Sequence, residues 1–107
     1  MRTQRLQRSA TGPLFKIAVL TAAAGQRDAL AAALQALLEP TRQEAGCLDY
    51  VLFEAQDRPG TFFMRESFIS QAAFDAHCET AYFLDFKGRC PQLLGEPLKL
   101  LPLVKLG

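Results

Sequence analysis

Two neighbouring segments, Cys47–Ala55 and Thr61–Phe68, constrain the fold more than any other part of the chain. Both are rich in aromatic and β-branched residues, and the turn residues Asp, Pro and Gly occur in the segment between them, Gln56–Gly60. This pattern predicts a β-hairpin with a five-residue turn. Side chains alternate between the two faces of a strand, and both faces of this hairpin receive large apolar groups. We therefore expect helices to cover one face and a second layer, most simply another copy of the chain, to cover the other.

The segments before the hairpin predict a strand and a helix. Leu14–Thr21 is apolar on both sides, as expected for a central strand. Leucines at helical spacing after Gln26 indicate an amphipathic helix that packs on the sheet. Pro40 lacks an amide proton, so we expect it to kink or restart this helix. Gly46 is expected to supply the C-cap.

The segments after the hairpin predict two short helices and a last strand. Ser70 and Thr80 are favourable N-cap residues, and apolar residues follow each at helical spacing. The second helix is expected to fray or bend within Lys87–Pro91. Leu98–Leu106 is the last strand, in which Pro102 is tolerated only at a sheet edge or a bulge. The whole order predicts an α+β, ferredoxin-like βαββαβ fold with an antiparallel sheet.

Length and composition limit the function classes. A chain of 107 residues is one domain, which we divide into an N-terminal arm, residues 1–13, and a folded domain, residues 14–107. Half of the residues are hydrophobic, which favours an oligomer. The net charge is +1 and no basic stripe with interleaved aromatics occurs in the domain, so nucleic acid is not an expected partner. No apolar run reaches the length of a membrane span, so no membrane association is expected.

The cysteines and the N-terminus indicate a cytoplasmic location. The three cysteines form no C-x-x-C pair and leave an odd count, as expected for free thiols in a reducing compartment. Arginines precede an apolar run near the N-terminus, as in a signal peptide, but Lys16 interrupts that run. We expect this segment to be a strand of the fold instead.

Five motifs carry a resemblance to a known family. They are E-x-G-C-L-x-Y from Glu44, D-x-P-G-x-F from Asp57, R-E-S-F from Arg65, A-A-F-x-A-H from Ala72 and T-x-x-F-x-x-F from Thr80. Together they resemble the antibiotic biosynthesis monooxygenase superfamily. The resemblance implies a homodimer in which two sheets meet as a dimeric α+β barrel. It also implies oxidation of electron-rich aromatics such as quinols and anthrones by O2, without flavin, haem or metal.

Three polar residues are the candidate catalytic groups. His77 is the only histidine, and histidine is the only side chain whose unperturbed titration lies between pH 5 and 8, which suits a general base. Glu66 lies mid-strand among aromatic residues, where a carboxylate is costly to bury without a partner, so we expect it to meet His77 or Tyr50 and to orient the imidazole. Tyr50, on the same predicted face as Glu66, is expected to donate a hydrogen bond to a substrate oxygen.

Structural roles for these three residues stay open. His77 could be a histidine at the edge of the core that bonds to a carboxylate or carbonyl. Glu66 could cap backbone groups of the second helix. Tyr50 could be a core residue with its hydroxyl at the rim. The expected wall of the substrate pocket consists of Leu48, Phe62, Met64, Phe74, Tyr82, Phe83 and Phe86. Plain packing is the alternative for the aromatic residues of the second short helix. No metal site is expected, because His77 and Cys78 lack further ligands at a useful spacing.

These expectations lead to one main function and two alternatives. The main hypothesis is a cofactor-independent monooxygenase that oxidises a quinol- or anthrone-like aromatic with O2. The alternatives are an isomerase of a small hydroxy-ketone and a non-catalytic dimeric module that binds a small molecule. Haem degradation is disfavoured, because haem-degrading relatives rely on an Asn and a Trp, and this chain has neither.

Overall fold

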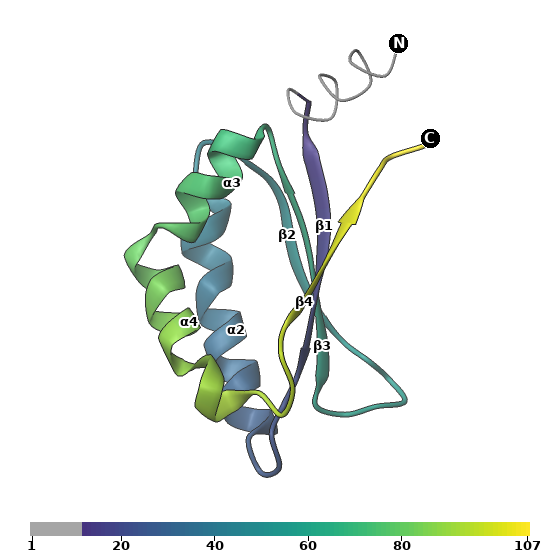
Figure 1. Ribbon diagram of the computed structural model, residues 1–107, viewed down its shortest axis with the longest axis vertical. Helices are drawn as coiled ribbons and strands as arrows, with labels where there is room; N and C mark the ends of the chain where they lie inside the picture. Colours follow the sequence, from purple (N-terminus) through teal and green to yellow (C-terminus); the bar gives the residue numbers. More distant parts are fainter. Residues whose placement is uncertain (1–11) are drawn as a thin grey trace.

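The computed structural model describes residues 12–107, so the predicted N-terminal arm lies almost entirely outside the described residues and its boundary at residue 13 stays a prediction. The elements in chain order are β1 (Leu14–Thr21), α2 (Arg27–Arg42), β2 (Cys47–Glu54), β3 (Thr61–Phe68), α3 (Gln71–Cys78), α4 (Ala81–Leu93) and β4 (Lys99–Leu103). The strands form one antiparallel sheet in the order β2-β3-β1-β4. All three helices cover the same face of this sheet (Figure 1). This arrangement confirms the predicted ferredoxin-like α+β fold.

Both prolines that were expected to interrupt helices lie inside them. α2 continues through Pro40 to Arg42, and α4 continues through Pro91 to Leu93. A restart of α2 at Pro40 was wrong, because this proline sits in the last turn of the helix, where little helix follows the missing hydrogen bond. A kink at Pro40 and a bend of α4 stay predictions. The carbonyl of Pro40 also accepts a hydrogen bond from the hydroxyl of Tyr82, at 3.4 Å, which ties the end of α2 to α4.

Gly46 is not the C-cap of α2. The cap is Gln43, whose backbone N–H bonds to the carbonyl of Pro40, while that of Glu44 bonds to the carbonyl of Thr41. Gly46 does not have a positive φ. A Cβ added at Gly46 would instead overlap the Cβ of Ala73 in α3. The glycine therefore permits a close approach between the start of β2 and α3, and the carbonyl of Gly46 accepts a hydrogen bond from the amide of Ile69 at 2.9 Å.

The two short helices begin at the predicted caps. The hydroxyl of Ser70 accepts a hydrogen bond from the amide of Ala73 at 3.1 Å, and that of Thr80 accepts one from the amide of Phe83 at 3.3 Å. Each bond satisfies one of the free N–H groups in the first turn. These caps fix where α3 and α4 start and thereby which of their side chains face the sheet.

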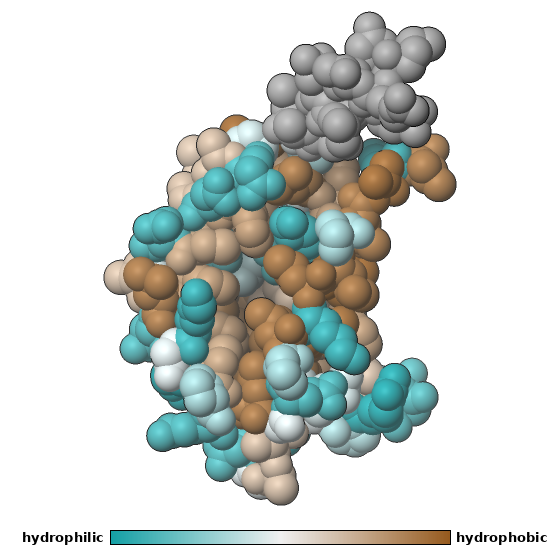
Figure 2. All heavy atoms as spheres, in the orientation of Figure 1, coloured by the Kyte–Doolittle hydropathy of each residue, from teal (hydrophilic) through white to brown (hydrophobic). Residues whose placement is uncertain are grey.

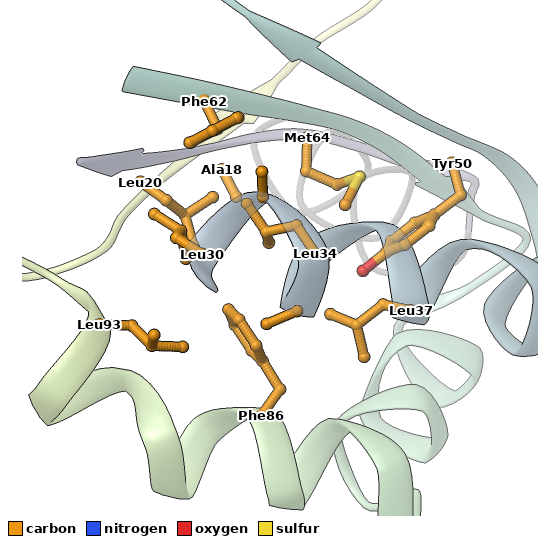
Figure 3. Packing of buried hydrophobic residues seen from close by; sticks show 12 residues of the cluster. Ala18, Leu20, Leu30, Leu34, Leu37, Tyr50, Phe62, Met64, Phe86 and Leu93 are labelled. Atoms are coloured by element: carbon orange, nitrogen blue, oxygen red, sulfur yellow. The ribbon is translucent and has the colours of Figure 1, made fainter. Parts of the chain in front are cut away.

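The hydrophobic core lies between the helices and the inner face of the sheet (Figure 3). Its labelled members are Ala18, Leu20, Leu30, Leu34, Leu37, Tyr50, Phe62, Met64, Phe86 and Leu93. The outer face of the sheet carries no helix and is also apolar, as predicted. Phe53 on this face is 47% exposed, and every residue of β4 is exposed. None of the helices in residues 12–107 combines the length and hydropathy that a membrane span needs.

Candidate functional site

A cavity of about 300 Å³ lies between the sheet and the helices. Every strand and every helix contributes to its wall, and so does Leu98, the residue just before β4. Among the sequence-predicted site residues, the cavity is lined by Tyr50, Glu66, His77, Met64, Phe74, Phe83 and Phe86. The three candidate catalytic residues are therefore brought to one apolar, aromatic-walled space, of the kind that binds small molecules.

Three residues predicted to line the pocket do not line this cavity. Leu48 is 57% exposed, because Cys47 pairs with Phe68 and Asp49 with Ser67, which leaves Leu48 as the extra residue of a β-bulge. Such a bulge shifts the alternation of side chains between the two faces. The other two residues, Phe62 and Tyr82, have partners outside the cavity.

Phe62 and Tyr82 belong to neighbouring parts of the molecule. Phe62 is buried in the core, and the guanidinium of Arg27 lies 5.7 Å from its ring centroid. Tyr82 directs its hydroxyl to Oε2 of Glu44 through a short hydrogen bond. Tyr82 thus acts on the cavity only through Glu44.

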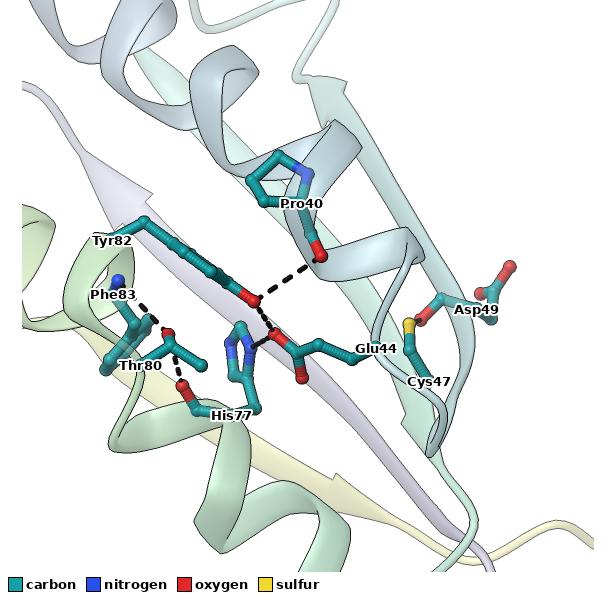
Figure 4. Close-up of polar contacts among 8 residues, drawn as sticks. All are labelled: Pro40, Glu44, Cys47, Asp49, His77, Thr80, Tyr82 and Phe83. Atoms are coloured by element: carbon teal, nitrogen blue, oxygen red, sulfur yellow. Dashed lines mark hydrogen bonds and ion pairs between the residues drawn. The ribbon is translucent and has the colours of Figure 1, made fainter.

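The imidazole of His77 is held by Glu44, a residue to which the sequence analysis gave no role. Nδ1 of His77 lies 3.0 Å from Oε2 of Glu44, and the same oxygen accepts the hydrogen bond from Tyr82 (Figure 4). His77 is 1% exposed, with its ring centroid 5.5 Å from that of Tyr50 and 5.0 Å from that of Phe83. The expectation that Glu66 orients the imidazole was therefore wrong: Glu44 takes that place.

The Glu44 carboxylate fixes which nitrogen of His77 carries the hydrogen when the ring is neutral. Burial, followed by the hydrogen bond to Glu44, raises the pKa of Tyr82 to about 12, so its hydroxyl stays protonated and donates to the carboxylate. A carboxylate can only accept, so Nδ1 of His77 carries the hydrogen that it donates to Oε2. Nε2 is then the basic nitrogen of a ring that lines the cavity. This is the arrangement that a histidine general base requires.

Glu66 is a second titratable group on the wall of the same cavity. It is 6% exposed, and burial raises the pKa of its carboxyl to about 7, an effect that the charge of Lys16 partly opposes. Lys16 lies directly across from Glu66 in the pairing of β1 with β3, and Tyr50 lies directly across from it in the pairing of β2 with β3. The expected neighbourhood of Glu66 and Tyr50 is thus confirmed. Glu66 does not cap a helix, because Ser70 and Thr80 occupy both N-cap positions.

Tyr50 is suited to donate a hydrogen bond. Burial and then the carboxyl of Glu66 raise the pKa of its phenol, so the hydroxyl stays protonated at neutral pH. Its ring extends from β2 toward the helical layer, with the hydroxyl on the side of Leu37 (Figure 3). Tyr50 is both a core residue and part of the cavity wall, so a structural role and a role as hydrogen-bond donor are compatible.

Sequence reasoning missed several residues at the cavity. Glu44 opens the motif E-x-G-C-L-x-Y, so that motif was a signal for it. Lys87 and Cys90 also line the cavity, and both follow Phe83 at helical spacing, at i+4 and i+7. Within residues 12–107, no group of three or more His, Cys, Asp or Glu side chains is arranged to hold a metal ion.

The fold and the cavity define a class of protein: a single ferredoxin-like domain with histidine and carboxyl groups facing an enclosed apolar space between sheet and helices. Residues 13–89 match the family described as antibiotic biosynthesis monooxygenase, and the chain belongs to this family. The match includes Glu44, Tyr50, Glu66, His77 and Lys87.

Similar proteins and solved structures include one that is named a monooxygenase. A Mycobacterium tuberculosis protein named "Putative monooxygenase Rv0793" is 33% identical over 96 residues, which are 90% of this chain and 94% of that protein. An uncharacterised Synechocystis protein is 32% identical over 75 residues, and the matched part is 51% of its length, so this chain spans about half of that relative. The crystal structure of a Pseudomonas aeruginosa protein superposes with a TM-score of 0.86 at 38% identity, covering 92% of this chain and 98% of that one. Family and names together support a monooxygenase-like function.

Proposed function

We propose that this protein is a cofactor-independent monooxygenase that oxidises a quinol- or anthrone-like aromatic with O2. The observation that carries the proposal is the presence of two proton-transfer groups on one apolar cavity: His77, oriented by Glu44, and Glu66, whose carboxyl pKa is about 7. Pairs of titratable groups with different environments are typical of acid–base catalysis. The family supplies the link to O2.

The proposed reaction draws its electrons from the substrate. For an anthrone, removal of a proton from the ring carbon gives an enolate, which passes one electron to O2. The two radicals combine to a peroxide on that carbon, and loss of water from the peroxide gives the quinone. One oxygen atom of O2 enters the new carbonyl and the other leaves as water, so anthrone and O2 give anthraquinone and water.

Each cavity residue has a role in this sequence. His77 removes the first proton through Nε2, and Glu44 stabilises the imidazolium that forms. The imidazolium returns this proton to the peroxide anion. As the O–O bond breaks, His77 removes the second hydrogen from the ring carbon, and the carboxyl of Glu66 gives a proton to the leaving hydroxide, which its pKa of about 7 permits at neutral pH. Tyr50 donates a hydrogen bond to the oxygen that carries the enolate charge. The apolar wall keeps water from the charged intermediate.

An isomerase is the second candidate, and the same pair of groups favours it. Moving a proton between the adjacent carbons of a small hydroxy-ketone needs one base and one acid close together. His77 and Glu66 would supply them without O2. A binding module without turnover is the remaining alternative.

We also propose that the protein acts as a homodimer in the cytoplasm. The uncovered face of the sheet supports the dimer, because it carries exposed apolar side chains such as Phe53, Leu101 and Leu103. Free thiols support a reducing compartment, since Cys47, Cys78 and Cys90 form no disulfide among the described residues.

Oxygen uptake tests the proposal. Purified protein is assayed with chelator present against a panel of quinols, naphthols and anthrones, and wild type is compared with His77→Ala. We expect saturable uptake that the variant loses. Saturable uptake that is unchanged in His77→Ala would remove His77 from the mechanism. Conversion of a hydroxy-ketone without uptake would favour the isomerase, and ligand-induced melting shifts without turnover would favour the binding module.

A further inference from the structure

Lys87 places a positive charge on the cavity-facing side of α4. It follows Phe83 by four residues and precedes Cys90 by three, so the three side chains lie on one face of the helix. All three line the cavity. Within residues 12–107, Lys87 is the only lysine or arginine that does so.

Lys87 stands where the cavity opens to the surface. A shallower depression next to the cavity shares Lys87, Cys90 and Leu98 with it and is further lined by residues such as Gly95 and Glu96. The shared residues place the mouth between α4 and the segment that leads into β4. In the space-filling view, a hollow lies between the helical layer and the hydrophobic side chains of the C-terminal strand (Figure 2). A ligand that enters here passes the lysine before it reaches His77.

The charge of Lys87 is available to a ligand. The ion pairs within residues 12–107 join Arg27 to Asp28 and Glu54, Arg65 to Asp49, and His77 to Glu44, and none includes Lys87. Glu96, the acidic residue of the outer depression, accepts a hydrogen bond from the hydroxyl of Thr21 at 3.4 Å.

The other nearby cation is already engaged. Nζ of Lys16 lies 4.7 Å from the ring centroid of Phe74, and Lys16 is the cross-strand partner of Glu66. It does not line the cavity. The charge of Lys87 also acts on the cavity wall: burial raises the pKa of the Cys78 thiol, and Lys87, like Lys16, is one of the charges that oppose this effect.

We propose that Lys87 binds a carboxylate substituent of the substrate at the mouth of the cavity, while the ring that carries the reactive hydroxyl reaches Glu66 and His77. The preferred substrate is thus a quinol- or anthrone-like aromatic that carries a carboxylate, and neutral analogues react at lower kcat/KM. Charge-assisted hydrogen bonds between an ammonium and a carboxylate are stronger than neutral ones and fix orientation. This inference rests on the proposed function for its reaction, but its binding step can be measured separately.

Binding without turnover tests it. Three fluorescent probes are titrated anaerobically: 2-naphthol, which is neutral, and 3-hydroxy-2-naphthoate and 6-hydroxy-2-naphthoate, which add a carboxylate near to and far from the hydroxyl. The proteins are wild type, Lys87→Gln, Lys87→Arg, Lys16→Gln and the matched control Arg89→Gln. Arg89 is exposed on the same helix, two residues on, and does not line the cavity. Melting temperatures verify that each variant is folded.

Wild type should bind at least one hydroxynaphthoate about five- to tenfold more tightly than 2-naphthol, the size of one accessible ion pair or charged hydrogen bond. Lys87→Gln should lose this preference with the affinity for 2-naphthol unchanged, and Lys87→Arg and Arg89→Gln should keep it. Equal affinities in wild type, a preference that survives in Lys87→Gln, or a preference that depends on Lys16 alone would each overturn the inference. So would failure of all three probes to bind.

The binding result is independent of the oxygen assay. A carboxylate preference that depends on Lys87, in a protein that consumes no O2, supports this inference and contradicts the proposed oxygenase. Oxygen uptake with neutral and acidic quinols at equal kcat/KM supports the oxygenase and contradicts this inference.

Discussion

Nδ1 of His77 and Oε2 of Glu44 lie 3.0 Å apart, although 33 positions separate the two residues in the chain. The contact joins the turn after α2 to the end of α3, and Tyr82 from α4 donates to the same carboxylate. The orientation of the His77 ring, and with it the position of Nε2, therefore depends on the packing of all three helices. If His77 is the base, Glu44 is its positioning residue.

Glu44→Gln should lower kcat with little change in KM. The amide can still accept the Nδ1 hydrogen, but it lacks the charge that stabilises the imidazolium. Loss of such a positioning partner typically costs about tenfold or more. Tyr82→Phe is the matched control, because it keeps the carboxylate and removes the hydrogen bonds of the Tyr82 hydroxyl to Glu44 and to the carbonyl of Pro40. Steady-state kinetics on both variants would contradict the assignment if kcat of Glu44→Gln equalled that of wild type.

Glu66→Gln should stabilise the protein at neutral and alkaline pH. The folded-state pKa of about 7 exceeds the ordinary 4.5, so the folded state binds more protons than the unfolded state between these values. Stability of the wild type therefore falls as pH rises from 4.5 to 7 and then levels off. The shift corresponds to roughly 3 kcal/mol, as an upper bound. Glutamine does not titrate, so the free energy of unfolding of Glu66→Gln should not show this fall between pH 4.5 and 7.

Glu54 offers a control with the opposite sign. The hydrogen bond from Arg27 lowers the pKa of the Glu54 carboxyl to about 2. Its contribution to stability is therefore present above pH 4.5 and is lost as pH falls toward 2. Urea unfolding of wild type, Glu66→Gln and Glu54→Gln between pH 3 and 8.5 separates the two effects. Parallel pH profiles for wild type and Glu66→Gln would show that the Glu66 carboxyl is not perturbed.

Gly46→Ala should destabilise the fold and reduce activity together. The added methyl group would overlap the Cβ of Ala73, so α3 must move away from the start of β2, and α3 carries His77. Overpacking of this kind costs about 1–3 kcal/mol. Gly88→Ala is the control: nothing lies within 4 Å of its added Cβ, and alanine in a helix is favoured over glycine by about 1 kcal/mol. Thermal unfolding that ranks Gly46→Ala at or above wild type would contradict the close approach.

Phe53→Glu should convert the proposed dimer to monomer. Phe53 is 47% exposed on the uncovered face of the sheet, where burying a carboxylate in a dimer interface carries a large desolvation cost. Leu84→Glu is the control, because Leu84 is 50% exposed but lies on α4, on the helical side of the molecule. Light scattering after size-exclusion chromatography measures the mass. A wild-type monomer, or a dimer that Leu84→Glu disrupts and Phe53→Glu does not, would refute this interface.

The strands and caps could be predicted from the sequence because their signals are local. Alternation and turn residues defined β2 and β3, and Ser70 and Thr80 act within their own first turns. The failures concern relations between distant segments. No periodicity shows that the end of α2 meets α3, so Glu44 was overlooked and Glu66 was assigned its role. Leu48 was misplaced because one bulge residue reverses the parity from which its face was inferred.

The most direct test of the central claim is the fate of the oxygen atoms. Anthrone is oxidised under ¹⁸O2 by wild type and by His77→Ala, and the product is analysed promptly by mass spectrometry. The account predicts anthraquinone with one ¹⁸O atom per molecule, labelled water, no accumulating hydrogen peroxide, and loss of this product in the variant. Unlabelled quinone, with its new oxygen taken from water and two molecules of hydrogen peroxide formed per quinone, would show an oxidase, and would contradict a monooxygenase that inserts one oxygen atom into its substrate.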